Sequence, residues 1–163
     1  MYKNFEFKIA YQDPNSQARI GILKTPHGDV QTPNFIFCAT KAAIKGLTPQ
    51  QEKECGAQII LSNTYHLHIR PGEKLIQDLG GIHKFMGWDG PILTDSGGFQ
   101  VYSLKGLRKI SDEGVEFQSH VDGSPVFFSP ERVVEIQETL GVDIMMVLDE
   151  CLPAASSREE VQR

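Results

Sequence analysis

Four short apolar runs recur along the chain, separated by polar and helix-prone sequence. They are NFIFCA (34–39), AQIILSN (57–63), PILTD (91–95) and VDIMMVLDE (142–150). Continuous apolar runs of this length are typical of strands that are buried on both faces of a parallel sheet. Because helical patterns alternate with the runs, the sequence predicts repeated β-α units and an α/β fold.

End signals mark the helices between the runs. Thr48 as N-cap, Pro49 at the first helical position and Gly56 beyond the end predict a helix over LTPQQEKECG. PGEKLIQDLGG predicts a helix that ends at Gly80, and SSREEVQR predicts the start of another. The strongest pattern is SPERVVEIQETLG, which has Ser129 as cap and an apolar stripe of Val133, Val134, Ile136 and Leu140.

Two segments alternate apolar and polar residues around turn sequences. ARIGILKTPHGDVQTP does so around His27-Gly28-Asp29, and GVEFQSHVDGSPVFFSP around Asp122-Gly123. Each pattern predicts an antiparallel hairpin. We therefore expect an N-terminal β-hairpin region over residues 1–33 and the first β-α units over residues 34–163.

Polar residues stand where the apolar runs stop, at Cys38, Asn63, Asp95 and Asp149. The carboxyl ends of parallel strands meet at the ligand-binding edge of a sheet or barrel. Asp95 and Asp149 are therefore expected to face one site from neighbouring strands. The alternative is that each carboxylate caps only the turn that follows it.

The residues after Asp95 suit a flat ligand. Gly97 and Gly98 let the backbone pass close to such a ligand, and Phe99 offers an aromatic face, although it could equally fill a core. In LDEC (148–151), Asp149 offers two acceptor oxygens to a ligand with adjacent N–H donors. The Watson–Crick edge of guanine carries such a donor pair.

Composition and charge narrow the class of protein. The chain has 163 residues, 40% of them apolar and 23% charged, which is ordinary for a globular protein. A net charge of −5 excludes a bulk nucleic-acid binder. Contacts with phosphates would have to come from two local patches, which could equally be solvated surface: Lys41 and Lys45, and Lys105, Arg108 and Lys109.

Neither a membrane span nor a secretory signal is indicated, so we expect a cytoplasmic protein. The cysteines are Cys38, Cys55 and Cys151, an odd number without metal-ligand spacing, which favours reduced thiols. His66 and His68 are two residues apart and not four, so they do not form a metal pair on one helix face. The residues therefore predict no metal site.

Several longer motifs, in order, resemble the tRNA-guanine transglycosylases, most closely the bacterial enzymes of the queuine pathway. They are ATKAAIKGLTP, LSNTYHLHIRPG, GPILTDSGGFQVYSL, GVEFQSHVDGS, SPERVVEIQETLGVDI and LDEC. The resemblance implies a (β/α)₈ TIM barrel with an N-terminal antiparallel sheet. Residues 1–163 would form the N-terminal part of this single barrel domain, with about four of its β-α units.

The resemblance also implies an activity and partners. The family exchanges guanine at the wobble position of tRNA anticodons for a 7-deazaguanine precursor of queuosine, by double displacement. Its partners are the tRNA anticodon loop, the free bases and a second copy of the enzyme in a homodimer. The implied metal is zinc, and no organic cofactor is implied.

Site roles follow from the matching motifs. The resemblance implies that Asp95 is the general acid/base, that Phe99 stacks on the base and that Asp149 recognises its N–H donors. Asn63 would lie beside the ribose or the nucleophile. The remaining residues, expected to line the same pocket, are Ser96, Gly97, Gly98 and Cys151.

The family's nucleophilic aspartate and its cysteine- and histidine-bound zinc lie in a second half that this sequence does not contain. We therefore expect the 163 residues alone to be inactive. One alternative is a non-catalytic subunit or fragment that lends a base-binding barrel face to a partner, although intact Asp95, Phe99 and Asp149 argue against it. The other is an unrelated small-molecule (β/α)₈ enzyme that uses two strand-end aspartates.

Overall fold

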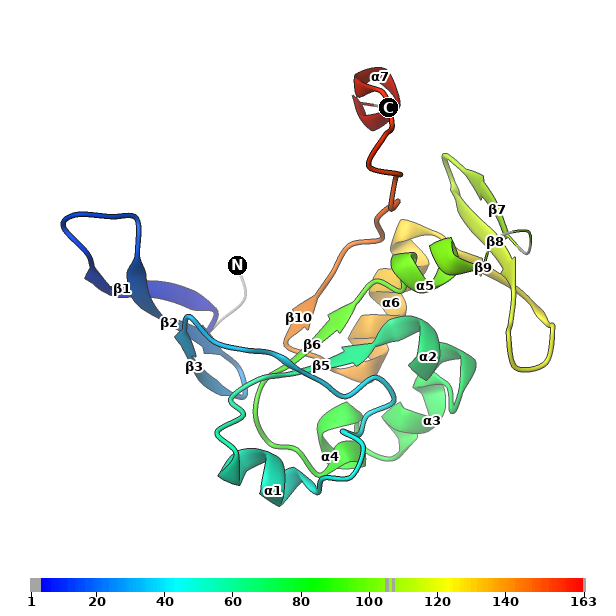
Figure 1. Ribbon diagram of the computed structural model, residues 1–163. Helices are drawn as coiled ribbons and strands as arrows, with labels where there is room; N and C mark the ends of the chain where they lie inside the picture. The colour runs from blue at the N-terminus through cyan, green and yellow to red at the C-terminus, as the bar shows by residue number, and fades with distance from the viewer. Residues whose placement is uncertain (1–3, 105, 107, 163) are drawn as a thin grey trace.

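The N-terminal segment forms an antiparallel three-stranded sheet in the computed structural model, which describes residues 4–104, 106 and 108–162. Its strands are β1 (Glu6–Gln12), β2 (Arg19–Thr25) and β3 (Gly28–Thr32), in the order β1-β2-β3. Thr25 lies opposite Gly28, so the predicted hairpin is confirmed, and β1 adds a strand that was not predicted. This sheet projects to one side of the molecule (Figure 1).

A parallel sheet forms the centre of the chain. Its strands are β4 (Phe37–Cys38), β5 (Ile60–Asn63), β6 (Ile92–Asp95) and β10 (Ile144–Met145). They lie in the order β10-β6-β5-β4, so each strand lies beside the one that precedes it in this sheet along the chain. The predicted β-α repeats are therefore confirmed.

The fourth apolar run is a shorter strand than predicted, because β10 ends at Met145 and not at Asp149. The buried side chain of Gln137 binds the backbone at this point: its Oε1 accepts from Met146 N (3.0 Å) and its Nε2 donates to Met146 O (2.9 Å). Met146 N also donates to Thr94 O of β6 (3.1 Å), which is the last of these contacts with the sheet. Beyond this point the chain leaves the sheet and continues irregularly to Asp149.

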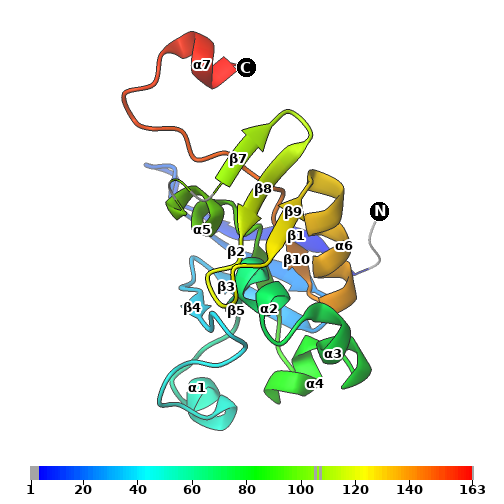
Figure 2. The same cartoon turned by 90° about the vertical axis from the view of Figure 1, so that its right-hand side faces the viewer.

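Seven helices are described: α1 (Pro49–Glu54), α2 (Thr64–Ile69), α3 (Glu73–Asp78), α4 (Ile82–Met86), α5 (Gly98–Ser103), α6 (Pro130–Leu140) and α7 (Arg158–Gln162). The predicted caps are confirmed, since Thr48 forms a capping box with Gln51 and Ser129 Oγ accepts from Arg132 N. Helices α2, α4 and α5 were not predicted. Figure 2 shows α2, α3, α4 and α6 together on one side of the parallel sheet.

A second antiparallel sheet is inserted between α5 and α6. It contains β7 (Arg108–Ser111), β8 (Gly114–Gln118) and β9 (Pro125–Phe128). Gln118 lies opposite Pro125, which confirms the hairpin predicted around Asp122-Gly123. Lys105, part of one predicted basic patch, lies outside the described residues.

The side chains of β6 alternate between the core and the candidate site. Ile92 and Thr94 are fully buried, and Thr94 Oγ1 donates to Gln137 Oε1 of α6 (2.8 Å), so this face packs against the helices. Successive side chains of a strand point to opposite faces. Asp95 therefore lies on the face away from α6, at the end of its strand. The predicted stripe of α6 is buried at Val133, Ile136 and Leu140 and half-buried at Val134.

Across the described residues, we find no helix with the length and apolar character that crossing a bilayer requires.

Candidate functional site

Asp95 is held at the end of β6 by the neighbouring strand. In the parallel register it lies opposite Asn63, the last residue of β5. Asn63 Nδ2 donates to Asp95 Oδ2 (2.6 Å), and the backbone N–H of Thr64 donates to Oδ1 (3.2 Å). Each carboxylate oxygen thus accepts at least one hydrogen bond, which orients the group.

Asn63 is 2% exposed and is engaged at both ends of its amide. Its Oδ1 accepts from His66 N (2.9 Å), so it is the N-cap of α2 as well as the donor to Asp95. The structure places it behind Asp95, where it orients the carboxylate. Its contact with a ribose or a nucleophile stays a prediction.

The pKa of the Asp95 carboxyl group is raised above its ordinary value. Burial raises the pKa of Asp95 most, and the negative charge of Asp149 raises it further. Hydrogen bonds from Thr64, Asn63 and Gly97 oppose this but do not cancel it. A carboxyl group with a raised pKa, in a hollow, is suited to exchange protons with a bound ligand.

A hydrogen bond from Ser96 holds Asp149 near Asp95, although β10, the strand that precedes Asp149, ends four residues earlier. Ser96 Oγ donates to Asp149 Oδ1 (2.8 Å) and accepts from Gly98 N (3.1 Å). Cys151 Sγ donates to Asp149 Oδ2 (3.4 Å). Burial raises the pKa of the Cys151 thiol, and the hydrogen bond to Asp149 raises it further, so the thiol keeps its proton. Since each Asp149 oxygen accepts one such bond, each retains acceptor capacity for a ligand.

The two glycines are required for different reasons. Gly97 has a φ of +81°, and a Cβ there would lie 2.8 Å from Cβ of Tyr65. At Gly98 a Cβ would lie 2.5 Å from both the backbone oxygen and Oδ1 of Asp149. The glycine pair therefore lets α5 begin directly against the Asp149 segment.

Six of the predicted residues line one hollow of about 280 Å³: Asp95, Ser96, Gly97, Gly98, Phe99 and Asp149. The side chain of Phe99 is free, since the residue is 64% exposed. Cys151 lines a neighbouring hollow that shares Gly98 and Asp149. Three further lining residues were missed, and two of them stand within the fourth apolar run: Gln100, Met146 and Val147.

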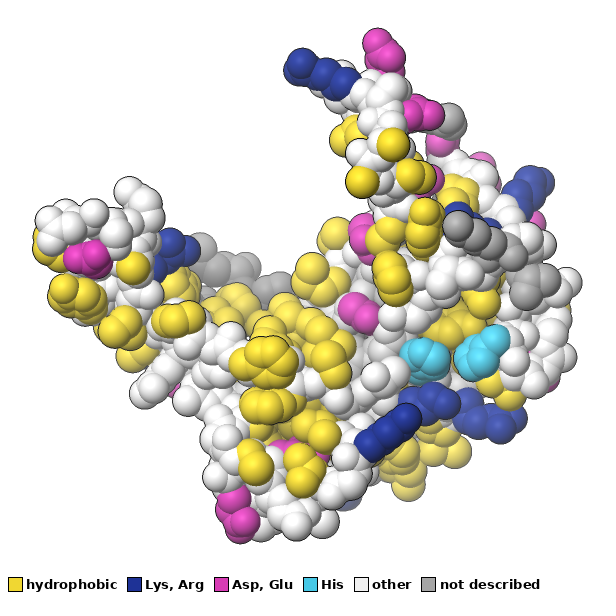
Figure 3. Space-filling model, in the orientation of Figure 1, with side chains coloured by type: hydrophobic (Ala, Val, Ile, Leu, Met, Phe, Trp, Pro, Cys, Tyr) yellow, Lys and Arg dark blue, Asp and Glu magenta, His cyan; other side chains and the backbone are white. Residues whose placement is uncertain are grey.

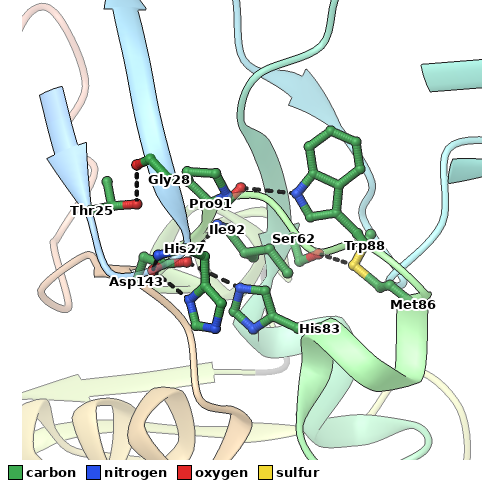
Figure 4. Close-up of polar contacts among 10 residues, drawn as sticks. All are labelled: Thr25, His27, Gly28, Ser62, His83, Met86, Trp88, Pro91, Ile92 and Asp143. Atoms are coloured by element: carbon green, nitrogen blue, oxygen red, sulfur yellow. Dashed lines mark hydrogen bonds and ion pairs between the residues drawn. The ribbon is translucent and has the colours of Figure 1, made fainter. Parts of the chain in front are cut away.

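One group of described residues has the donor set of a metal site. His27 Nδ1 lies 2.8 Å from Asp143 Oδ1, and His83 Nε2 lies 3.1 Å from Oδ2 (Figure 4). The imidazole rings stack, with centroids 3.7 Å apart and an angle of 19° between their planes. Ring lone pairs lie in the ring plane, so one ion cannot lie in both of these nearly parallel planes.

Both carboxylate oxygens of Asp143 also accept hydrogen bonds from backbone N–H groups. Its Oδ1 accepts from His27 N (3.2 Å) and its Oδ2 from Ile92 N (2.9 Å). Burial would raise the pKa of Asp143, but the hydrogen bonds from His83, His27 and Ile92 outweigh burial and lower it. This cluster joins the β2–β3 turn to β6 and β10, and it does not fit zinc. No other potential metal-ligand group of three or more occurs in the described part of the chain.

The sequence is similar to the enzymes of one protein family. The family described as "Queuine tRNA-ribosyltransferase" matches residues 13–163. The queuine tRNA-ribosyltransferase of Desulforudis audaxviator is 58% identical over 96% of this chain and 42% of its own length. The enzymes of the same name from Pelotomaculum thermopropionicum and Thermoanaerobacter pseudethanolicus are 58% and 56% identical, over 94% and 97% of this chain. The chain spans about 42% of the length of these relatives.

Proposed function

Because the chain belongs to the queuine tRNA-ribosyltransferase family, we propose that it contributes the base-binding and proton-transfer groups for exchange of guanine in tRNA for a 7-deazaguanine. The observation that carries this proposal is the pairing of Asp95 and Asp149 around one hollow, with an exposed aromatic ring beside them. The substrates in this proposal are the anticodon loop of tRNA and the two free bases.

We propose that the fold is part of a (β/α)₈ barrel. The parallel strands succeed one another in chain order, as neighbouring strands of such a barrel do. Residues 1–33 then form the N-terminal sheet region, and residues 34–163 supply the first four strands. The proposed setting is a cytoplasmic homodimer, as the resemblance to the family implies.

Base recognition is assigned to Asp149 and Phe99. The two carboxylate oxygens of Asp149 match the adjacent N1–H and N2–H donors of guanine, which a 7-deazaguanine shares. Phe99 provides an apolar face for stacking, and stacking of this kind tolerates changes at position 7 of the base. Gly97 and Gly98 let Tyr65 and Asp149 pack directly against this loop, which keeps the recognition carboxylate beside the hollow.

Proton transfer is assigned to Asp95. In the proposed double displacement, a carboxylate outside the 163 residues attacks ribose C1′ and the C1′–N9 bond breaks. Asp95 gives its proton to the departing guanine. It then takes a proton from the incoming base as that base attacks C1′ and displaces the carboxylate. Its raised pKa supports both steps, because it lowers the cost of holding the proton.

Two substitutions test these roles separately. Asp149→Asn replaces an acceptor oxygen by a donor, so guanine should bind about 5- to 150-fold more weakly in calorimetry, a loss of about 1–3 kcal/mol. Asp95→Asn should change guanine affinity much less, but should lower turnover by roughly 10²–10⁴. Turnover is measured as incorporation of labelled guanine into tRNA.

Because the relatives are longer, turnover is assayed on this chain fused to the part of the Desulforudis audaxviator enzyme that the match does not cover. Asp78→Asn, on the exposed surface of α3, is the matched control. The proposal is wrong if Asp149→Asn binds guanine like the unchanged chain, or if Asp95→Asn retains full turnover.

A further inference from the structure

A second cluster of polar side chains lies at the same edge of the sheet as Asp95. Lys41 follows β4, and the preceding carbonyl of Thr40 accepts from Asn63 N (3.2 Å). His66 lies in the first turn of α2, whose N-cap is also Asn63. His120 comes from the β8–β9 connection and contacts both Tyr65 and His66, with ring centroids 5.4 Å and 5.6 Å away. The cluster of Lys41, His66 and His120 therefore adjoins the hollow.

A buried phenol fixes the orientation of the His120 ring. Tyr65 is 2% exposed, and its hydroxyl lies 2.6 Å from His120 Nδ1. Burial raises the pKa of Tyr65, so the phenol keeps its proton. The phenol oxygen accepts from the backbone N–H of His120. Its own proton is therefore donated to Nδ1, since a buried hydroxyl without an acceptor would cost about 1–3 kcal/mol.

Once Nδ1 accepts this bond, the ring proton of His120 is on Nε2. His120 is exposed at the surface, whereas Tyr65 is buried below it. Tyr65 also packs against Gly97, which lines the base-binding hollow, so the residue that orients His120 supports the wall of this hollow. The result is a fixed N–H donor at the rim of the site.

Lys41 brings a positive charge to this rim, although the net charge of the chain is −5. Burial lowers the pKa of His66 most, and the positive charge of Lys41 lowers it further. Lys41 is exposed and free to move toward a ligand. Figure 3 shows histidine side chains beside a group of Lys and Arg side chains on the hollowed face of the molecule.

We propose that Lys41 and His120 bind a backbone phosphate of the RNA strand whose base occupies the hollow. The inference rests on the proposed function and extends it from the base to the strand. A lysine ammonium and a fixed imidazole N–H complement the anionic oxygens of a phosphodiester. Because the hollow admits a single base, the strand that carries this base must cross its rim, where the cluster lies.

The two residues should affect RNA binding in different ways. Loss of a lysine that contacts a phosphate lowers the slope of log K against log salt by about 0.7 for a single strand. Loss of an uncharged donor lowers affinity without this change in slope. We therefore expect Lys41→Ala to reduce both affinity and slope, and His120→Ala to reduce affinity about 3- to 10-fold at an unchanged slope.

The experiment measures fluorescence anisotropy of a labelled RNA stem-loop with the full 163-residue chain at several salt concentrations. Lys74→Ala on α3 removes the same charge from a remote exposed position and is the matched control. His120→Gln, which restores an N–H donor, should recover part of the affinity lost in His120→Ala. Tyr65→Phe should weaken RNA binding as well, because the imidazole loses its fixed orientation.

Guanine binding by calorimetry separates the two proposals. If the chain binds guanine but Lys41→Ala and Lys74→Ala change RNA binding equally, the phosphate site is wrong and the base site stands. If the unchanged chain binds no RNA, the phosphate site is also overturned. If it binds RNA with the expected variant effects but not guanine, the proposed function is wrong and the phosphate site stands.

Discussion

Gly98→Ala is predicted to damage the base site while leaving the fold in place. The added Cβ would lie 2.5 Å from the backbone oxygen and Oδ1 of Asp149, and 3.2 Å from Ser96 Oγ. Contacts below 3.0 Å essentially never occur for a real Cβ, so the Asp149 segment would have to move by about 0.5 Å or more. The Ser96–Asp149 hydrogen bond is the first contact that this movement would break.

Two effects of opposite sign determine how Gly98→Ala changes the free energy of unfolding. Gly98 is the first residue of α5 and has no positive φ, so alanine favours the helix by up to about 1 kcal/mol. This gain offsets part of the steric cost, and we expect the free energy of unfolding to change by less than about 2 kcal/mol. Displacement of the recognition carboxylate should weaken guanine binding about 10- to 100-fold.

Calorimetric guanine titration and the thermal unfolding midpoint measure the two quantities. Gly123→Ala is the control, since a Cβ there meets no atom within 4 Å and its φ of +74° adds only backbone strain. That variant should lose stability but keep guanine affinity. Unchanged affinity in Gly98→Ala would show that Asp149 does not hold the base.

Three further predictions concern the same site and its support. Phe99→Tyr should leave guanine affinity nearly unchanged, whereas Phe99→Ala should lose about 1–3 kcal/mol of stacking in calorimetry; equal affinities would exclude stacking. Carbon-13 titration should place the pKa of Asp95 above 3.8, and lower it in Asp149→Asn. Because the folded-state pKa is raised, the associated stability is greatest below pH 3.8 and is lost as pH rises through the folded value. Asp143→Asn should lower the unfolding midpoint by roughly 2–10 °C, because an amide in either orientation faces one backbone N–H with its own N–H₂ group; an unchanged midpoint would contradict this.

The sequence predicted those elements whose signals are local. The caps at Thr48 and Ser129 and both hairpin turns are short patterns that determine backbone geometry by themselves. The rule that neighbouring parallel strands end at a common edge predicted where Asp95, Ser96 and Phe99 lie. Asp149 reaches the same hollow for another reason, because it lies beyond the end of β10 and is held by its hydrogen bond from Ser96.

Two missed helices have sequences that favour strands. TYHLHI (64–69) and GFQVYS (98–103) are rich in aromatic and β-branched residues, which have low helix propensity. Both become helical because of what precedes them: Asn63 supplies a side-chain cap to α2, and Gly97 with its left-handed backbone begins α5. Asn63 is a cap signal that predicts the start of α2, in addition to its place at the site.

Contacts between distant segments could not be predicted. His27 and Asp143 are 116 positions apart, and Tyr65 and His120 are 55 apart. No periodicity or motif spacing relates such pairs, since they depend on how complete sheets pack. The fixed His120 donor therefore emerged only from the three-dimensional arrangement.

The stacking of His27 on His83 also provides a spectroscopic reporter. Each imidazole lies over the other at 3.7 Å, so the ring current of one should shift the carbon-bound protons of the other upfield. These signals lie in an uncrowded part of the proton spectrum, and His27 belongs to the turn that attaches the N-terminal sheet. A simple NMR spectrum can thus reveal whether the N-terminal sheet is packed against the rest of the chain, without a label and without altering any residue of the hollow.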